Sequence, residues 1–182
     1  RYLRGTLNSV HILPFFPYTS DDGFAVVDYT KVNPEVGDWH HLTAIAGHHR
    51  LMGDMVLNHV SSLHPWFVQY VQGQEPGRGY FIEVDPQTDL SQVVRPRPQS
   101  LLREVETVNG SRHVWCTFSH DQVDLDFSNP DLLLEFIRLL RLFLDKGITT
   151  IRLDAVAFIW KEIGTSCIHL PQTHEIVRLM RT

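Results

Sequence analysis

Three short apolar runs alternate along this chain with segments that have the periodicity of helices. The runs cover residues 9–16, 52–59 and 148–155, and their lengths and flanking turn residues are typical of buried strands. The helical segments begin at capping residues, Asp38 in one case and residues 128–131 in the other. Strands that alternate with helices are characteristic of parallel βα units, so we expect an α/β fold. The pattern is compatible with a doubly wound sheet and with a TIM barrel.

A long stretch of different composition separates the second predicted strand from the second predicted helix. Pro, Gly, Arg and Gln cluster in residues 72–80 and 86–98, and the apolar periodicity is weak. Because structureless loops of such length are uncommon, we expect residues 61–126, here called the inserted region, to form a small domain of short strands. The predicted division is therefore residues 1–60, the inserted region, and residues 127–182.

Charge, cysteine content and hydropathy exclude several classes of protein. Sixteen Lys and Arg residues against 21 Asp and Glu residues give a net charge of −5, so no basic surplus exists to bind nucleic acid. The most apolar stretch, residues 132–144, contains three charged residues and is far shorter than the ~20 apolar residues of a membrane span. Two cysteines cannot form a disulfide framework. We expect a cytoplasmic protein with no nucleic-acid or membrane partner.

Polar residues at the ends of the predicted strands are the candidates for chemistry. Side chains two apart in a strand share a face, which places Arg152 beside Asp154 and Asp54 beside Asn58, with His59 next along the chain. The carboxyl ends of parallel strands are where α/β enzymes keep their functional groups. For Asp154 a functional role and a structural ion pair with Arg152 are equal alternatives. For Asp54 we favour a buried carboxylate that holds neighbouring loops.

Histidine is abundant, with eleven residues, but its spacing does not indicate a metal centre. The pairs His40–His41 and His48–His49 are expected on the solvated face of a helix. The sequence contains neither a zinc-protease motif nor a Gly-rich phosphate loop. We therefore expect no metal and no organic cofactor.

Two motifs at the predicted strand ends resemble those of the alpha-amylase family. Residues 54–59 (DMVLNH) are similar to the family's DxxxNH motif, and residues 151–155 (IRLDA) are similar to its nucleophile motif. Other segments resemble the sucrose-phosphorylase-like branch, which includes sucrose and glucosylglycerate phosphorylases. These segments are HILPFFPYTSDDGFAVVDY (residues 11–29), RPRP (95–98), VWCTFSHDQVDLDF (114–127) and KEIGTSCIHLP (161–171).

The resemblance implies a fold and a place within it. In this family a small domain B follows strand 3 of a TIM barrel, which matches the position of the inserted region. Residues 1–60 would then supply strands 2 and 3, and residues 127–182 would supply strand 4 and the helix after it. The family's acid/base Glu, at the end of strand 5, would lie outside this chain. We expect an internal fragment of a longer enzyme that is inactive when isolated.

The resemblance also implies a reaction, the transfer of glucose from a sucrose-like or glucosylglycerate-like α-glucoside to inorganic phosphate. The configuration would be retained and glucose 1-phosphate would be released. Asp154 would be the nucleophile that forms a covalent β-glucosyl intermediate, and Arg152 would orient this carboxylate and hold it ionised. Phosphate would be a co-substrate, so the expected partners are a small α-glucoside and phosphate.

Six further residues match substrate-binding positions of the family. Asp21 and His59 would hydrogen-bond the glucose. Phe24 and Phe118 would form walls beside it. Gln122 and Arg97 would contact the acceptor or phosphate. Val94 replaces a Tyr expected before RPRP in sucrose phosphorylases, and PYTSDDGF is more similar to relatives that act on glucosylglycerate or similar glucosides. The alternatives are a hydrolase or transglucosidase of small α-glucosides and a non-catalytic sugar-binding homologue.

Overall fold

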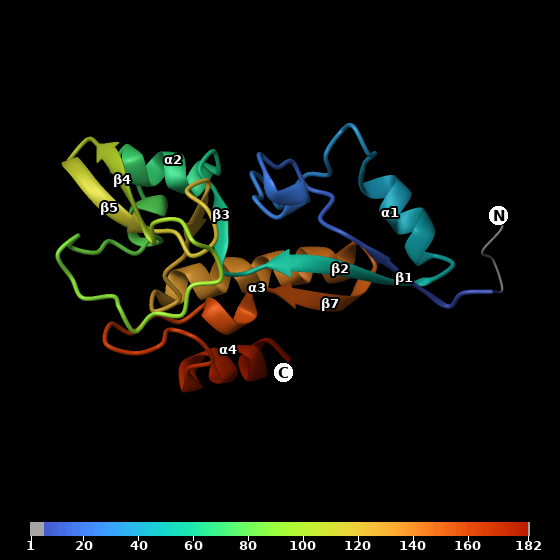
Figure 1. Ribbon diagram of the computed structural model, residues 1–182. Coiled ribbons are helices and arrows are strands. Elements are labelled where there is room, and N and C mark those ends of the chain that lie inside the picture. Colours follow the sequence, from blue (N-terminus) through green and yellow to red (C-terminus); the bar gives the residue numbers. More distant parts are fainter. Residues whose placement is uncertain (1–5, 182) are drawn as a thin grey trace.

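The computed structural model describes residues 6–181 and contains a three-stranded parallel sheet. Its strands, in spatial order, are β1 (Ser9–Ile12), β2 (Arg50–Val56) and β7 (Ile148–Asp154) (Figure 1). The expected α/β fold is confirmed, and all three strands occur where apolar runs predicted them. Strand β1 ends four residues before the predicted end at residue 16, because Pro14, which cannot donate to a strand ladder, interrupts the run.

Three helices accompany the sheet: α1 (Trp39–Ala46), α3 (Pro130–Asp145) and α4 (Pro171–Arg181). The Asp38 side chain caps α1 by accepting hydrogen bonds from the backbone of His40 and His41. Helix α4 begins five residues before the predicted start at residue 176, since Pro171 already has the φ of a first helical turn. His48 and His49 follow α1 instead of lying on it, because the helix ends at Ala46. No helix among residues 6–181 is long and apolar enough to cross a membrane.

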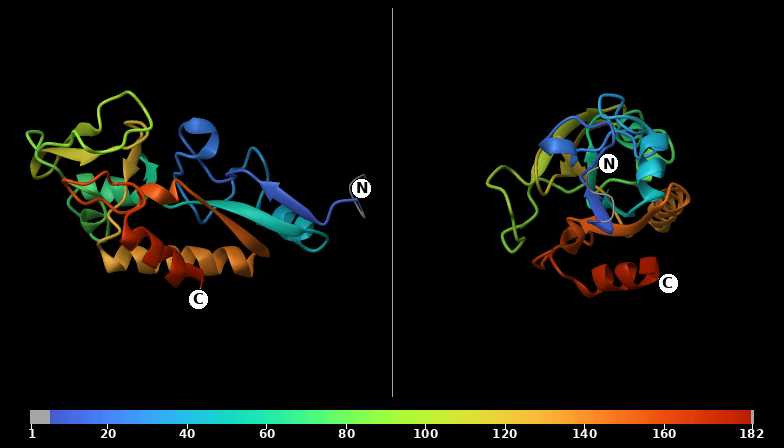
Figure 2. Two further views of the ribbon diagram at one scale, coloured as in Figure 1. Left: turned by 60° about the horizontal axis from the view of Figure 1, so that its bottom comes forward. Right: turned by 90° about the vertical axis from the view of Figure 1, so that its right-hand side faces the viewer.

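Helices α3 and α4 lie on one side of β7 (Figure 2). The side chains of Thr149, Ile151 and Leu153 line a hollow there together with apolar residues of the two helices. Because side chains alternate along a strand, the residues between them, including Arg152 and Asp154, project from the opposite face. The predicted common face of this pair is therefore confirmed.

The inserted region contains short strands, as expected; they pair antiparallel, and one α-helix lies among them. Its elements, together with the strand that precedes it, are β3 (His59–Ser61), α2 (Pro65–Val71), β4 (Leu102–Thr107), β5 (Gly110–Trp115) and β6 (Gln122–Asp124). Strand β3 pairs with β6 and β4 pairs with β5. Figure 1 shows these elements beyond the carboxyl ends of β2 and β7, so the region is adjacent to the strand ends that carry the candidate residues.

A cluster of aromatic side chains packs against α3 and is hydrogen-bonded to the last residue of β2. Phe16 stacks on Phe143 with ring centroids 5.5 Å apart, and Tyr29 contacts Phe136 at 5.9 Å. All four rings are buried. The Tyr29 hydroxyl donates a 2.6 Å hydrogen bond to the carbonyl of Val56, the last residue of β2. This bond anchors the chain just before it enters the candidate site.

The buried His64 side chain makes the stability of the protein dependent on pH. Its Nδ1 accepts a hydrogen bond from the backbone of Trp66 and so caps α2. Burial lowers the pKa of His64 to about 4, although the nearby Asp28 carboxylate opposes the shift. The unfolded chain therefore binds a proton between pH 6.5 and 4 that the folded protein does not bind. The contribution of His64 to stability is therefore fully present above pH 6.5 and is lost progressively as the pH drops towards 4.

We expect His64→Asn to weaken this pH dependence, because Asn retains the cap but does not titrate. The free energy of unfolding should fall less steeply between pH 6.5 and 4, by about 1.4 kcal/mol per pH unit. Urea unfolding at several pH values measures the slope. His48→Asn, at an exposed position, is the matched control for loss of a histidine. Equal slopes for the wild type and His64→Asn would contradict the prediction.

Candidate active site

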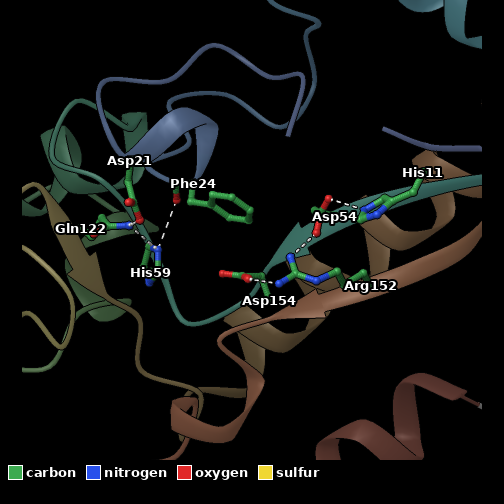
Figure 3. A network of polar contacts seen from close by, with 8 residues as sticks. All are labelled: His11, Asp21, Phe24, Asp54, His59, Gln122, Arg152 and Asp154. Carbon is green, nitrogen blue, oxygen red and sulfur yellow. Dashed lines mark hydrogen bonds and ion pairs between the residues drawn. The ribbon is translucent and has the colours of Figure 1, made fainter. Parts of the chain in front are cut away.

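The register between β2 and β7 places three charged side chains in a row. Asp54 lies opposite Arg152, and Val56 lies opposite Asp154. The Arg152 guanidinium donates to Asp54 Oδ1 through Nη1, and its Nη2 is 3.0 Å from Asp154 Oδ1 (Figure 3). Asp54 is fully buried and its other oxygen is 2.8 Å from His11 Nε2. Asp54 is thus a buried carboxylate as predicted, but it contacts side chains of the two neighbouring strands and not the loops, because the strand register brings these side chains to its level.

The electrostatics of Asp154 differ from the simple expectation that Arg152 lowers its pKa. Burial raises the pKa of Asp154, and this effect outweighs the lowering by Arg152. The negative charge of Asp54 adds to the upward shift. The physical reason is that one guanidinium serves two carboxylates, so it compensates only in part for the burial of Asp154. The ion pair with Arg152 fixes the orientation of the carboxylate, whose side chain is 18% exposed.

The loop after β1 brings Asp21 and Phe24 to this strand end. Residues Asp21, Asp22 and Gly23 all have positive φ angles, of 55°, 51° and 107°. A Cβ on Gly23 would lie 2.9 Å from the carbonyl oxygen of Pro14, so only glycine fits this turn. The Phe24 ring lies over Arg152, with its centroid 5.7 Å from the guanidinium carbon.

His59, Gln122 and Asp21 form a second polar group beside Asp154 (Figure 3). Gln122 Nε2 donates a 2.9 Å hydrogen bond to Asp21 Oδ2 and is 3.1 Å from His59 Nε2. The imidazole Nε2 of His59 donates to the Phe24 carbonyl over 3.2 Å. Burial lowers the pKa of His59 to about 4, so its imidazole is neutral at neutral pH. These groups can hydrogen-bond the hydroxyls of a ligand without adding a cation to the site.

Phe118, a predicted wall residue, lies beside the polar group, whereas Arg97 lies away from it. The Phe118 ring packs beside His59, with centroids 5.1 Å apart, and contacts Phe158 at 5.4 Å. Arg97 lies in an exposed stretch at residues 94–98 and, within the described part of the chain, makes no hydrogen bond or ion pair with the other candidates. The structure therefore groups seven of the eight candidates and leaves Arg97 apart; the roles assigned to all eight remain predictions.

A buried ion pair behind His59 was not predicted from the sequence. Lys161 Nζ is 2.7 Å from Asp124 Oδ2 and 2.7 Å from Asn58 Oδ1, and the Lys161 and Asp124 side chains are 4% and 0% exposed. Asn58 Nδ2 donates to Asp124 over 2.9 Å and is 3.2 Å from His59 Nδ1. Thr117 donates two further hydrogen bonds to Asp124, from its backbone and from its hydroxyl. This network fixes the orientation of the His59 ring.

The position of Asp124 in this network could have been predicted from the sequence. Gln122 and Asp124 are two apart in β6, so the face argument that linked Arg152 to Asp154 applies to them as well. The contact of Lys161 could not be predicted from local periodicity, because Lys161 follows β7 in an irregular segment, 103 residues from Asn58.

The arrangement suits covalent chemistry on a polyhydroxylated ligand. A carboxylate at a strand end, oriented by a guanidinium, can act as a nucleophile. Neutral polar groups and aromatic walls beside it can bind a small polar substrate. Among the residues that the structure describes, the group with ligand atoms close enough for a metal ion is Asp38, His40 and His41, at the exposed start of α1. Asp38 there already serves as the helix cap.

Comparisons with known proteins agree with this geometry. The family model of the alpha-amylase catalytic domain matches residues 2–182. A glucosylglycerate phosphorylase of Allomeiothermus silvanus is 54% identical over 179 residues, which are 98% of this chain and 32% of that protein. A glucosylglycerate phosphorylase of Escherichia coli is 48% identical over 184 residues, 100% of this chain and 33% of that protein.

A solved structure shares the fold. The crystal structure of sucrose 6F-phosphate phosphorylase from Thermoanaerobacter thermosaccharolyticum superposes with a TM-score of 0.91 at 26% identity, over 98% of this chain and 40% of that one. The chain spans about a third of the length of the curated relatives it matches. Its three parallel strands therefore correspond to part of a larger α/β barrel.

Proposed function

The chain belongs to the alpha-amylase family, and from this premise we propose that it supplies the nucleophile and the donor-sugar contacts of a retaining α-glucoside phosphorylase. The observation that carries the proposal is the Arg152–Asp154 pair at the end of β7, next to the group of Asp21, His59 and Gln122. The first group offers a positioned nucleophile, and the second offers hydrogen-bonding groups for a glucose ring.

In the proposed reaction Asp154 attacks the anomeric carbon of the donor. The glycosidic C–O bond breaks, the leaving oxygen takes a proton from a general acid, and a β-glucosyl ester forms on Asp154. Phosphate then attacks the same carbon, the ester bond breaks, and glucose 1-phosphate leaves with the α-configuration restored. A retaining mechanism needs a second carboxyl group about 5–5.5 Å from the first. We place this acid/base Glu outside the present chain.

Glucosylglycerate is the donor that we favour over sucrose. The relatives that are 54% and 48% identical are both named for glucosylglycerate. Val94 stands where the sucrose-phosphorylase pattern has Tyr, which argues against sucrose as the donor. Phe24 and Phe118 would form the walls of the glucose site, and Gln122 and Arg97 would contact the acceptor or phosphate.

We expect the complete protein that carries this chain to produce glucose 1-phosphate from glucosylglycerate only when phosphate is present. The measurement compares glucosylglycerate with sucrose, with and without inorganic phosphate, and quantifies glucose 1-phosphate and free glucose. Glucosylglycerate should be the better donor. Free glucose that forms regardless of phosphate would identify a hydrolase, and glucose binding without turnover would identify a sugar-binding homologue; either result would reject the phosphorylase.

A further inference from the structure

A single carboxylate ties the loop after β1 to the inserted region. Asp121 Oδ2 accepts hydrogen bonds from the hydroxyls of Thr19 and Ser20, each 2.5 Å long. Asp121 Oδ1 accepts a 2.7 Å bond from the hydroxyl of Ser62, and the Ser62 backbone donates to the Asp121 carbonyl. Short hydroxyl–carboxylate bonds of this kind are charge-assisted and stronger than neutral ones. We call this set of four residues the Asp121 clamp.

The clamp joins the three segments that carry the polar group of the candidate site. Thr19 and Ser20 directly precede Asp21 in the chain. Ser62 follows His59 by three positions, and Asp121 directly precedes Gln122. The Thr19 hydroxyl is also 2.7 Å from the hydroxyl of Ser61, in β3, which adds a direct bond between loop and strand. A shift of the clamp would therefore move all three polar side chains relative to one another.

The loop that the clamp holds has an unfavourable backbone. Asp21 and Asp22 are not glycines, yet both have left-handed φ angles, and Gly23 continues the run. Such conformations persist only where surrounding contacts enforce them, and they concentrate at functional sites. The bonds from Thr19 and Ser20 to Asp121 lie immediately before this run, so together with the bond from Gln122 to Asp21 they are contacts placed to enforce it.

We propose that Asp121 is a positioning residue that holds the strained loop of residues 19–24 against the inserted region and so presents Asp21 and Phe24 to the donor glucose. The inference rests on the proposed function, because it assigns the loop to glucose binding. Asp121 acts through the loop and does not contact the substrate itself.

The protonation of Asp121 is consistent with this role. Burial alone would raise the pKa of Asp121, but the hydrogen bonds from Ser20, Thr19 and Ser62 outweigh it, and the pKa lies below its usual value. At neutral pH the clamp is therefore built on a carboxylate, which can accept all three hydroxyl bonds at once.

The test removes the clamp from each side in the complete protein. Asp121→Ala removes the acceptor, and the double variant Thr19→Val/Ser20→Ala removes the donors of the loop while leaving Asp121 in place. We expect each to raise the KM for the glucoside and the Kd for glucose by about tenfold or more, with a much smaller change in kcat. Asp121→Asn keeps the shape and part of the hydrogen bonding, so it should restore much of the affinity.

The matched control is Asp126→Ala. Asp126 is also in the inserted region and also accepts a serine hydroxyl bond, from Ser128, but it lies outside the site. Asp126→Ala should leave the KM for the glucoside and the Kd for glucose unchanged. Wild-type glucose affinity in Asp121→Ala and in the double variant would overturn the clamp even where phosphorolysis is observed. Because glucose binding is measured without phosphate, a failure of the proposed reaction is recognised separately, from the turnover of the wild type.

Discussion

Replacing Asp154 with Asn should reduce turnover of the glucoside by about 10⁴-fold or more. The amide has nearly the shape of the carboxylate, but it has no negative charge and cannot form the glucosyl ester. The bond from Arg152 Nη2 to Oδ1 of this side chain is compatible with the amide oxygen, so the orientation of the side chain should persist. The loss should therefore fall on kcat, while the affinity for glucose changes little.

Two measurements separate this chemical role from a structural one. Steady-state kinetics of the complete protein with saturating donor report kcat, and mass spectrometry after rapid acid quench reports a glucosyl adduct on the wild type that the variant lacks. The control is Asp89→Asn, in an exposed turn of the inserted region where Asp89 accepts a hydrogen bond from the backbone of Ser91. A variant at Asp154 that keeps more than a few per cent of turnover would exclude Asp154 as the nucleophile.

The parts of the site that the sequence predicted are those that depend on local periodicity. Arg152 and Asp154 share a face because they are two apart in one strand, and the apolar residues between and around them identify that strand without tertiary information. The caps at Asp38 and Asn129 are local in the same sense. Such features could be predicted because hydrogen bonding within a few residues decides them.

The parts that could not be predicted depend on contacts between distant segments. Asp124 and Lys161 meet because β6 pairs with β3 and because an irregular segment after β7 returns to this pair. The three hydroxyls that donate to Asp121 come from residues up to 102 positions away from it in the chain. The upward pKa shift of Asp154 follows from burial and from its distance to Asp54, neither of which periodicity provides. In each case the chemistry of the side chains was visible in the sequence but their partners were not.

Removal of Lys161 should destabilise the protein strongly, because its side chain is the cation of a buried ion pair. Lys161→Met leaves the fully buried Asp124 with its hydrogen bonds from Thr117 and Asn58 but without a positive charge. Breaking a buried pair in this way typically costs 3–5 kcal/mol, because the remaining charge is uncompensated. Guanidinium unfolding followed by tryptophan fluorescence should show this loss. By contrast, Lys31→Met breaks an exposed pair with Asp28 of similar length, 2.8 Å, and should cost far less.

The same substitution should change how the site responds to acid. Lys161 lowers the pKa of His59 and Asp124 raises it, so removal of Lys161 alone shifts the pKa of His59 upwards from about 4. His59 would then become charged at a higher pH, and the acid limb of the activity profile should move in the same direction. The double variant Lys161→Met/Asp124→Asn removes both charges. It should regain much of the lost stability, since neutral replacement of a buried pair costs little, and it should reverse most of the upward shift in the pKa of His59. If Lys161→Met is no less stable than Lys31→Met, or if its acid limb is unmoved, the ion pair neither supports the fold nor controls His59. If both effects appear and the double variant reverses them, the buried pair sets the protonation state of His59, the residue that we propose contacts the donor glucose.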